Sequence, residues 1–259
     1  MRCGRRQWKL APVVGGLWAL LSLVPLPGAG GELAQWVNGG SNTGLFGYDW
    51  KTAGVCGLNL AGSPQSMRRD MEKIRAHRGE IADGAYVVFT LCPFTSVLTE
   101  AYDRRPSAST HALLDFDGQP DAAALEGFRR QLIDGWKGEF AIRDFADPMT
   151  EANRAAYRKM VAFARASVAW CRRERLVPVF VLPPAAKCFD DVFPDGFVRA
   201  YVADFVRDVG GDVPFFNYWR SLEFRDDRLF ANALFLNKSG RIRLTARTIA
   251  DIRRHFGQK

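Results

Sequence analysis

The 259-residue sequence has few of the residues that bind metal ions or carry redox chemistry. It contains five cysteines and three histidines, and no two cysteines form a C-x-x-C pair. Closely spaced cysteines and histidines are what a structural metal site needs, so we predict neither a metal nor a bound cofactor. The disulfide state of Cys56, Cys92, Cys171 and Cys188 is left open by their spacing. Cys92 ends an apolar run, a position typical of a buried free thiol.

Acidic residues are absent before Glu32, whereas four basic residues stand within the first nine positions. The apolar run that follows, from Ala11 to Val24, is shorter than the roughly 20 residues of a membrane-spanning helix. A basic start, an apolar middle and a small-residue exit are typical of an export signal. We therefore expect residues 1–30 to be a signal peptide or N-terminal anchor, and residues 31–259 to form one domain. The alternative is a leader that never serves as a signal.

A strong positive surplus is also missing from the expected domain. The formal net charge of +8 falls to +4 without the four basic residues of the leader. A surplus of that size is ordinary for a solvated surface, so no nucleic-acid partner is predicted. No later apolar run is long enough to span a bilayer, so we expect membrane contact only through the N-terminal segment.

Strand-like and helix-like patterns alternate along the expected domain. Ala85–Leu91 and Leu176–Leu182 are nearly continuous β-prone runs closed by prolines, as in strands buried on both faces of a parallel sheet. Between them, apolar residues recur at helical spacing from Thr150 to Arg173. Strand, helix, strand is the parallel crossover unit, so the sequence predicts an α/β fold.

Shorter segments continue this order. We expect a strand at Leu33–Val37, a helix at Met67–His77, a helix at Phe197–Val209, a strand at Val213–Tyr218 and a helix at Leu244–Phe256. Prolines and glycines interrupt the segment between Tyr102 and Arg143. That segment is predicted to be an irregular insertion above the strand ends rather than a second domain.

A serine lies in a cluster of turn-forming residues directly after the first expected strand. The cluster reads Asn-Gly-Gly-Ser-Asn-Thr from Asn38 to Thr43, with the serine at position 41. A serine on a tight turn at the carboxyl end of a strand is exposed, and its own backbone N–H can help to hold an oxyanion. Ser41 is therefore the candidate nucleophile.

Two further segments have the order and spacing of a known pattern. The first is Gly57–Ser66, in which Asn59 and Leu60 precede Ala61 and Gly62. The second is Leu229–Arg241, which contains Leu-Asn followed by a glycine. Together with the serine turn, these segments resemble the SGNH (GDSL-like) hydrolase superfamily.

The resemblance implies a three-layer, flavodoxin-like fold in which a central parallel sheet is flanked by helices. It also implies that Ser41 occupies the nucleophile position and that the N–H groups of Ser41 and of Ala61 or Gly62 are oxyanion donors. Two residues depart mildly from the pattern. Gly40 stands where the family has an acidic residue, and Ala61 stands where the family has glycine.

The last segment departs from the family at the residues that activate the serine. Aligned on its Leu-Asn and glycine, the family's Asp falls on Asn232 and its His on Phe235. Phenylalanine cannot accept a proton, and a serine without a base is a poor nucleophile at neutral pH. His77, His111 and His255 lie in a charged helix, an irregular segment and a basic helix, where structural roles are favoured.

Members of this superfamily include esterases and acyltransferases of envelope and extracellular polysaccharides. The resemblance implies an exported bacterial domain linked to acyl or acetyl ester chemistry on such polysaccharides, and catalytically impaired. If chemistry survives, Ser41 attacks an acyl carbonyl, and the base comes from elsewhere in the chain or from an envelope protein partner. The alternative is a non-catalytic module that binds a glycan or a protein, with Asn232 and Phe235 in its floor.

Overall fold

In the computed structural model, which describes residues 32–105, 116–118 and 120–258, five parallel strands form one central sheet. The strands are β1 (Ala34–Asn38), β2 (Gly57–Asn59), β3 (Ile81–Thr90), β4 (Val177–Leu182) and β5 (Phe215–Asn217). Their order across the sheet is β2-β1-β3-β4-β5. This is the strand order of a flavodoxin-like, doubly wound sheet, so the predicted fold class is confirmed.

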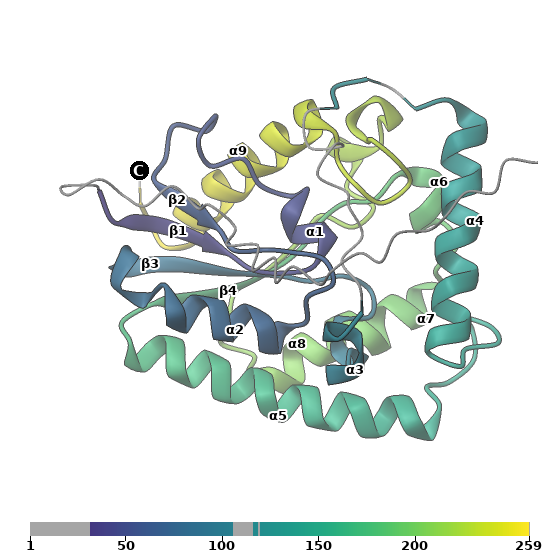
Figure 1. Ribbon diagram of the computed structural model, residues 1–259, viewed down its shortest axis with the longest axis horizontal. Coiled ribbons are helices and arrows are strands. Elements are labelled where there is room, and N and C mark those ends of the chain that lie inside the picture. The colour runs from purple at the N-terminus through teal and green to yellow at the C-terminus, as the bar shows by residue number, and fades with distance from the viewer. Residues whose placement is uncertain (1–31, 106–115, 119, 259) are drawn as a thin grey trace, which may run out of the picture. The chain divides into compact units, whose positions relative to one another are not determined.

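Helices pack against both faces of the sheet (Figure 1). The helices α2 (Met67–Ala76), α5 (Glu151–Arg173) and α8 (Asp204–Val209) lie on one face, and α9 (Lys238–His255) lies on the other. Shorter helices connect them: α1 (Asn42–Leu45), α3 (Glu100–Asp103), α6 (Lys187–Asp190) and α7 (Asp195–Val198). The helix α4 (Ala122–Glu139) packs on α6 beyond the strand ends. Helices, sheet and helices form the three predicted layers.

Alternation along the central strands divides the core between these two faces. In β3, Val87 and Phe89 pack with the helices of the first face, whereas Tyr86 and Val88 pack with α9. Because successive side chains of a strand point to opposite faces, a strand buried on both sides is apolar at every position. This explains why the sequence shows continuous apolar runs here instead of alternation.

A side chain at the start of each long helix caps it. The Ser66 hydroxyl accepts from the N–H of Arg68 at the start of α2, and Thr150 does the same for α5. Asn237 caps α9, which begins six residues before the predicted helix. Each cap satisfies a backbone donor that a helix leaves without an intrahelical partner.

The prediction of an irregular insertion between Tyr102 and Arg143 is wrong in its second half. An 18-residue helix, α4, occupies Ala122–Glu139. Three glycines within it and prolines before it weaken the local helical signal. The helix is stabilised by packing of its apolar face, which includes Leu125 and Ile133, against the rest of the domain.

The four cysteines in the described residues form no disulfide bond with one another. Residues 1–30, predicted to be a signal or anchor, lie outside the described part of the chain. Within the described part, no helix is long and apolar enough to cross a bilayer. The described ranges also hold no group of three acidic, cysteine or histidine side chains that could bind a metal ion.

Candidate active site

The serine turn follows β1 at the point where the strand order reverses. β1 pairs with β2 on one side and with β3 on the other, so the β1/β3 junction is the switch point of the sheet. Ligands of such sheets bind outside the carboxyl ends of strands at this junction. Ser41 is the N-cap of α1, and its carbonyl oxygen accepts from the N–H groups of Gly44 at 2.9 Å and Leu45 at 3.0 Å.

Gly40 connects the serine turn to the second motif segment. Its φ is +110°, a conformation that L side chains rarely adopt. Its N–H donates to the carboxyl Oδ1 of Asp70 at 2.8 Å, and its carbonyl accepts from the N–H of Gly62 at 3.1 Å. A Cβ at position 40 would lie 2.9 Å from the carbonyl oxygen of Thr90. Position 40 therefore requires glycine for its backbone and for its space.

The Ser41 side chain is enclosed rather than exposed. Its Oγ lies 2.8 Å from the hydroxyl of Tyr102, and the residue is only 9% exposed. The cavity beside it has a volume of about 10 Å³, and Cys92 and Leu98 contribute to its walls. A cavity of this size holds about one water molecule. The prediction that Ser41 is exposed is therefore wrong, because Tyr102 of α3 covers its side chain.

Tyr102 reaches Ser41 because α3 is attached to the start of α2. The Asp103 carboxylate accepts from the Ser66 N–H at 2.7 Å and from its hydroxyl at 2.6 Å. Burial raises the pKa of Tyr102 to about 12, and the nearby Cys92 thiol adds to the rise. A general base must be unprotonated at the working pH. Tyr102 is a neutral phenol at neutral pH, so it partners the serine without activating it.

A larger pocket lies on the other side of Tyr102. This Tyr102 pocket has a volume of about 290 Å³ and lies against α4. Its lining includes Tyr102, Arg105, Phe128, Leu132, Trp136 and Glu139. Arg105 forms an ion pair with Glu139 at 2.8 Å, and burial raises the pKa of the Glu139 carboxyl. The pocket thus combines aromatic surface with one charged pair.

The three predicted oxyanion donors differ in their availability. The N–H of Ala61 donates to the side-chain Oδ1 of Asn59 at 3.2 Å, and the N–H of Gly62 donates to the Gly40 carbonyl. The N–H of Ser41 donates to no other described residue. Ala61 or Gly62 would hold an oxyanion only after exchanging its present hydrogen bond, so their role stays a prediction.

Asn232 and Phe235 are the positions that the resemblance aligns with a catalytic Asp and His. In the structure, Asn232 stabilises a turn and Phe235 packs in the core. Asn232 Oδ1 accepts from the N–H groups of Leu234 at 3.0 Å and Phe235 at 2.8 Å. The Phe235 ring stacks on Phe46 with centroids 4.8 Å apart and meets the edge of Phe128 at 5.6 Å. A histidine ring would find no polar partner among these aromatic rings, which explains why the core holds phenylalanine here.

Substitutions at Asn232 test whether this side chain stabilises the turn. We expect Asn232→Ala to lower the free energy of unfolding by about 2 kcal/mol, because two buried backbone donors lose their acceptor. Asn232→Asp keeps an acceptor oxygen in place and should retain most of the stability. Urea denaturation followed by circular dichroism measures both. Equal losses in the two variants would contradict this role.

The two described histidines, His77 and His255, contact residues other than Ser41. His77 Nδ1 pairs with Glu80 Oε1 at 2.7 Å, just before β3 begins at Ile81, and thus at the amino ends of the strands. His255 makes edge contacts with the rings of Phe216 and Phe256. His111 lies outside the described residues. The structural roles predicted for His77 and His255 agree with these contacts.

The sequence analysis did not identify Asp70, which is 2% exposed and accepts a hydrogen bond from Gly40 in the serine turn. Burial raises the pKa of this carboxyl to about 7, although hydrogen bonds from Gly40 and Gln65 oppose the rise. One signal was present in the sequence. Asp70 lies at helical spacing from the apolar residues Met67 and Ile74, so it shares the buried face of α2.

Taken together, the sheet order and the flanking helices define a three-layer α/β domain with Ser41 at the carboxyl end of β1. No protein-family model and no curated protein matches the chain. Among solved structures, the chain is similar to a protein described as a lipolytic protein of the G-D-S-L family from Desulfitobacterium hafniense DCB-2. The two share 10% identity with a TM-score of 0.42, over 84% of this chain and 99% of the other.

Proposed function

We propose that this chain is an exported SGNH-like domain that binds acylated or acetylated surface polysaccharide and does not hydrolyse it as a serine esterase. The basic, apolar and small-residue order of residues 1–30 supports export. The three motif segments support a relation to acyl-ester chemistry. Catalytic impairment rests on the site itself.

The observation that carries the proposal is the enclosure of Ser41 under Tyr102. The serine hydroxyl is hydrogen-bonded to a phenol whose pKa is raised to about 12, so its partner does not take its proton at neutral pH. The cavity of about 10 Å³ has no room for an acyl group. Phe235 fills the position that the family gives to histidine. The described residues therefore give Ser41 neither room for an acyl group nor a base.

The Tyr102 pocket supports a binding role. Its volume of about 290 Å³ is close to the lower range of small-ligand pockets, which starts at roughly 300 Å³. Partly buried aromatic side chains, Phe128 and Trp136, give it flat apolar surface that a sugar ring or an acyl group can cover. The Arg105–Glu139 pair supplies hydrogen-bonding groups beside them.

A weak acyl-transfer activity is the second candidate, and one observation favours it. The backbone N–H of Ser41 donates to no other described residue, so it is available as an oxyanion donor. In this reading, α3 moves, Tyr102 leaves Ser41, and a base comes from a partner protein. Both candidates place the ligand at the carboxyl ends of the strands.

Labelling with a fluorophosphonate probe distinguishes the two candidates, since such probes react with an activated serine. We expect the purified full-length wild type to remain unlabelled, as Ser41→Ala does. Tyr102→Phe keeps the ring that covers Ser41 and removes the hydroxyl partner, so it should also remain unlabelled. Labelling of the wild type that Ser41→Ala abolishes would overturn the non-hydrolytic proposal.

Titration calorimetry with O-acetylated xylo-oligosaccharides tests the binding half of the proposal. We expect saturable binding that Phe128→Ala weakens about tenfold, because the pocket loses one of its aromatic walls. Ser41→Ala should bind as the wild type does, since the serine lies beneath Tyr102. No binding by folded protein, or equal binding by Phe128→Ala, would exclude the Tyr102 pocket as the glycan site.

A further inference from the structure

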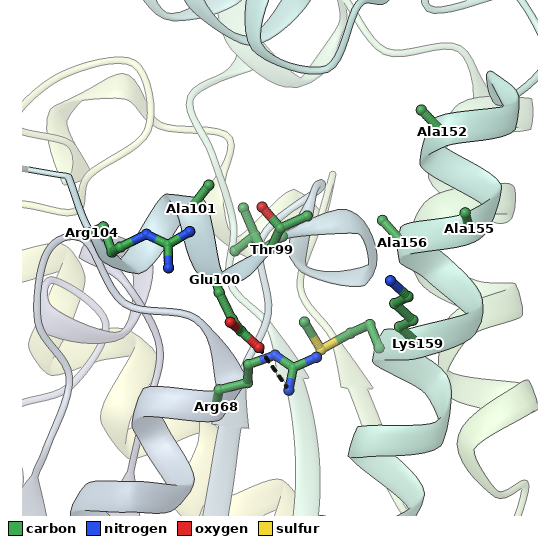
Figure 2. Close-up of a pocket in the computed structure, with 11 residues that line it drawn as sticks. Arg68, Thr99, Glu100, Ala101, Arg104, Ala152, Ala155, Ala156 and Lys159 are labelled. Carbon is green, nitrogen blue, oxygen red and sulfur yellow. Dashed lines mark ion pairs between the residues drawn. The ribbon is translucent and has the colours of Figure 1, made fainter.

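A third pocket lies between α3 and α5. This Lys159 pocket has a volume of about 410 Å³, within the range of about 300–1,000 Å³ that small-molecule sites occupy. In Figure 2, Ala152, Ala156 and Lys159 line it from α5, while Ala101 of α3 and Arg104, directly after α3, line it from the other side. It shares the buried wall residue Leu98 with the Ser41 cavity, but the serine does not line it.

The floor of the pocket is apolar. Three alanines on one face of α5 line it: Ala152, Ala155 and Ala156. The buried residues Met160 and Leu98 complete the apolar lining. Alanine fills little space, so the groove between the two helices stays open. A ligand that reaches this floor gains free energy by removing apolar surface from water.

Positive side chains surround this floor. Lys159 and Arg104 form no ion pair with any described residue, and Arg68 pairs only with Glu100 at 3.8 Å. Arg68 Nε is buried without a hydrogen-bond partner. A buried donor without an acceptor is unfavourable, so Arg68 adds to the excess of hydrogen-bond donors around the floor. The pocket therefore has more positive charge than its own residues neutralise.

The adjoining groove of about 340 Å³ carries a smaller positive excess. Its charged lining residues are Arg68, Arg69, Arg75 and Arg104 against Glu72, Glu100 and Asp103. The nearby aromatic rings are already covered, since Arg68 stacks on Phe163 at 4.8 Å and Arg75 on Trp170 at 5.3 Å. Single-stranded nucleic acids bind through free aromatic faces on which bases stack. The grooves offer positive charge without such faces, which favours a small anion over a nucleic acid.

We propose that the Lys159 pocket binds a small amphiphile that joins an anionic group to a short apolar chain. The anionic group, a carboxylate or a phosphate, interacts with Arg68, Arg104 and Lys159. The apolar chain lies over the alanines of α5. This site is separate from Ser41 and from the Tyr102 pocket, so it does not depend on the function proposed for them.

Titration calorimetry of the full-length protein with octanoate, octyl phosphate and octanol tests the proposal. We expect saturable binding of octanoate or octyl phosphate and at least tenfold weaker binding of octanol, which has the same chain without the charge. The stronger of the two anions shows whether a fatty acid or a phosphate-bearing lipid is the nearer relative of the ligand. Lys159→Glu and Arg104→Glu should each weaken binding at least tenfold.

Two further variants distinguish the pocket from general charge effects. Lys238→Glu makes the same charge change at an exposed position on α9, across the sheet, and should leave binding unchanged. Ala156→Phe fills the floor and should abolish binding while the protein stays folded by circular dichroism. The proposal is overturned if neither anion binds, if octanol binds equally well, or if Lys159→Glu binds as the wild type does.

Discussion

Gly40→Ala should destabilise the protein by about 4 kcal/mol. The φ of +110° disfavours an L side chain, and the new Cβ would lie 2.9 Å from both the Cβ and the carbonyl oxygen of Thr90. Backbone strain and overpacking each cost about 1–3 kcal/mol. Because Thr90 ends β3, the central strand cannot move aside cheaply. Urea denaturation at 25 °C followed by circular dichroism measures the loss.

Gly54→Ala is the matched control for this prediction. Gly54 also has a positive φ, +70°, but nothing lies within 4 Å of a Cβ placed there. Its substitution should cost only about 1–2 kcal/mol, the penalty of the left-handed conformation alone. If Gly40→Ala cost no more than Gly54→Ala, the close packing of the serine turn on β3 would be disproved.

Asp70→Asn should change how stability depends on pH. In the folded protein, burial raises the pKa of Asp70 to about 7 from an ordinary value of 3.8. Between these values the folded chain keeps a proton that the unfolded chain has released. The contribution of this carboxyl is therefore fully present below about pH 4, and the free energy of unfolding falls as the pH rises to about 7.

The effect is large because the carboxyl is completely buried. The difference between the two pKa values corresponds to on the order of 4 kcal/mol. Asparagine has the same shape and stays neutral, and its Oδ1 can accept from the Gly40 N–H. We expect the unfolding free energy of Asp70→Asn, relative to wild type, to increase by a few kcal/mol between pH 4 and pH 8.

Thermal or urea unfolding across this pH range checks the prediction, with Asp83→Asn as the control. Asp83 is exposed, and hydrogen bonds from Arg78 and Arg175 lower the pKa of its carboxyl. Its removal should not reproduce a gain that grows from pH 4 to pH 8. Parallel stability curves for wild type and Asp70→Asn would show that Asp70 is not the buried carboxyl described above.

The main strands and helices could be predicted from local patterns: continuous apolar runs for the buried strands and helical spacing of apolar residues for the helices. The run at Leu176–Leu182 became β4, and Thr150–Arg173 became α5 with Thr150 as its cap. Packing decided the cases where local preference is weak. The helix α4 forms despite three glycines, and β2 forms from three residues by pairing with β1.

The candidate site was predictable in part. A serine in a glycine-rich turn after a strand indicated Ser41, and the absence of histidine from position 235 indicated a missing base. Neither pattern indicated that Tyr102 covers the serine. Tyr102 and Ser41 are 61 residues apart, and they meet because Asp103 attaches α3 to the start of α2. No local spacing encodes such a contact.

By itself, the sequence determined the α/β class and the place of Ser41 at a strand end, because each depends on residues close together in the chain. The tertiary structure decided what these residues can do. It enclosed Ser41, raised the pKa values of Tyr102 and Asp70 by burial, and left Lys159 beside an open pocket without an ion-pair partner among the described residues. Solvent access and dielectric environment depend on which distant segments pack together, and only the folded chain fixes them.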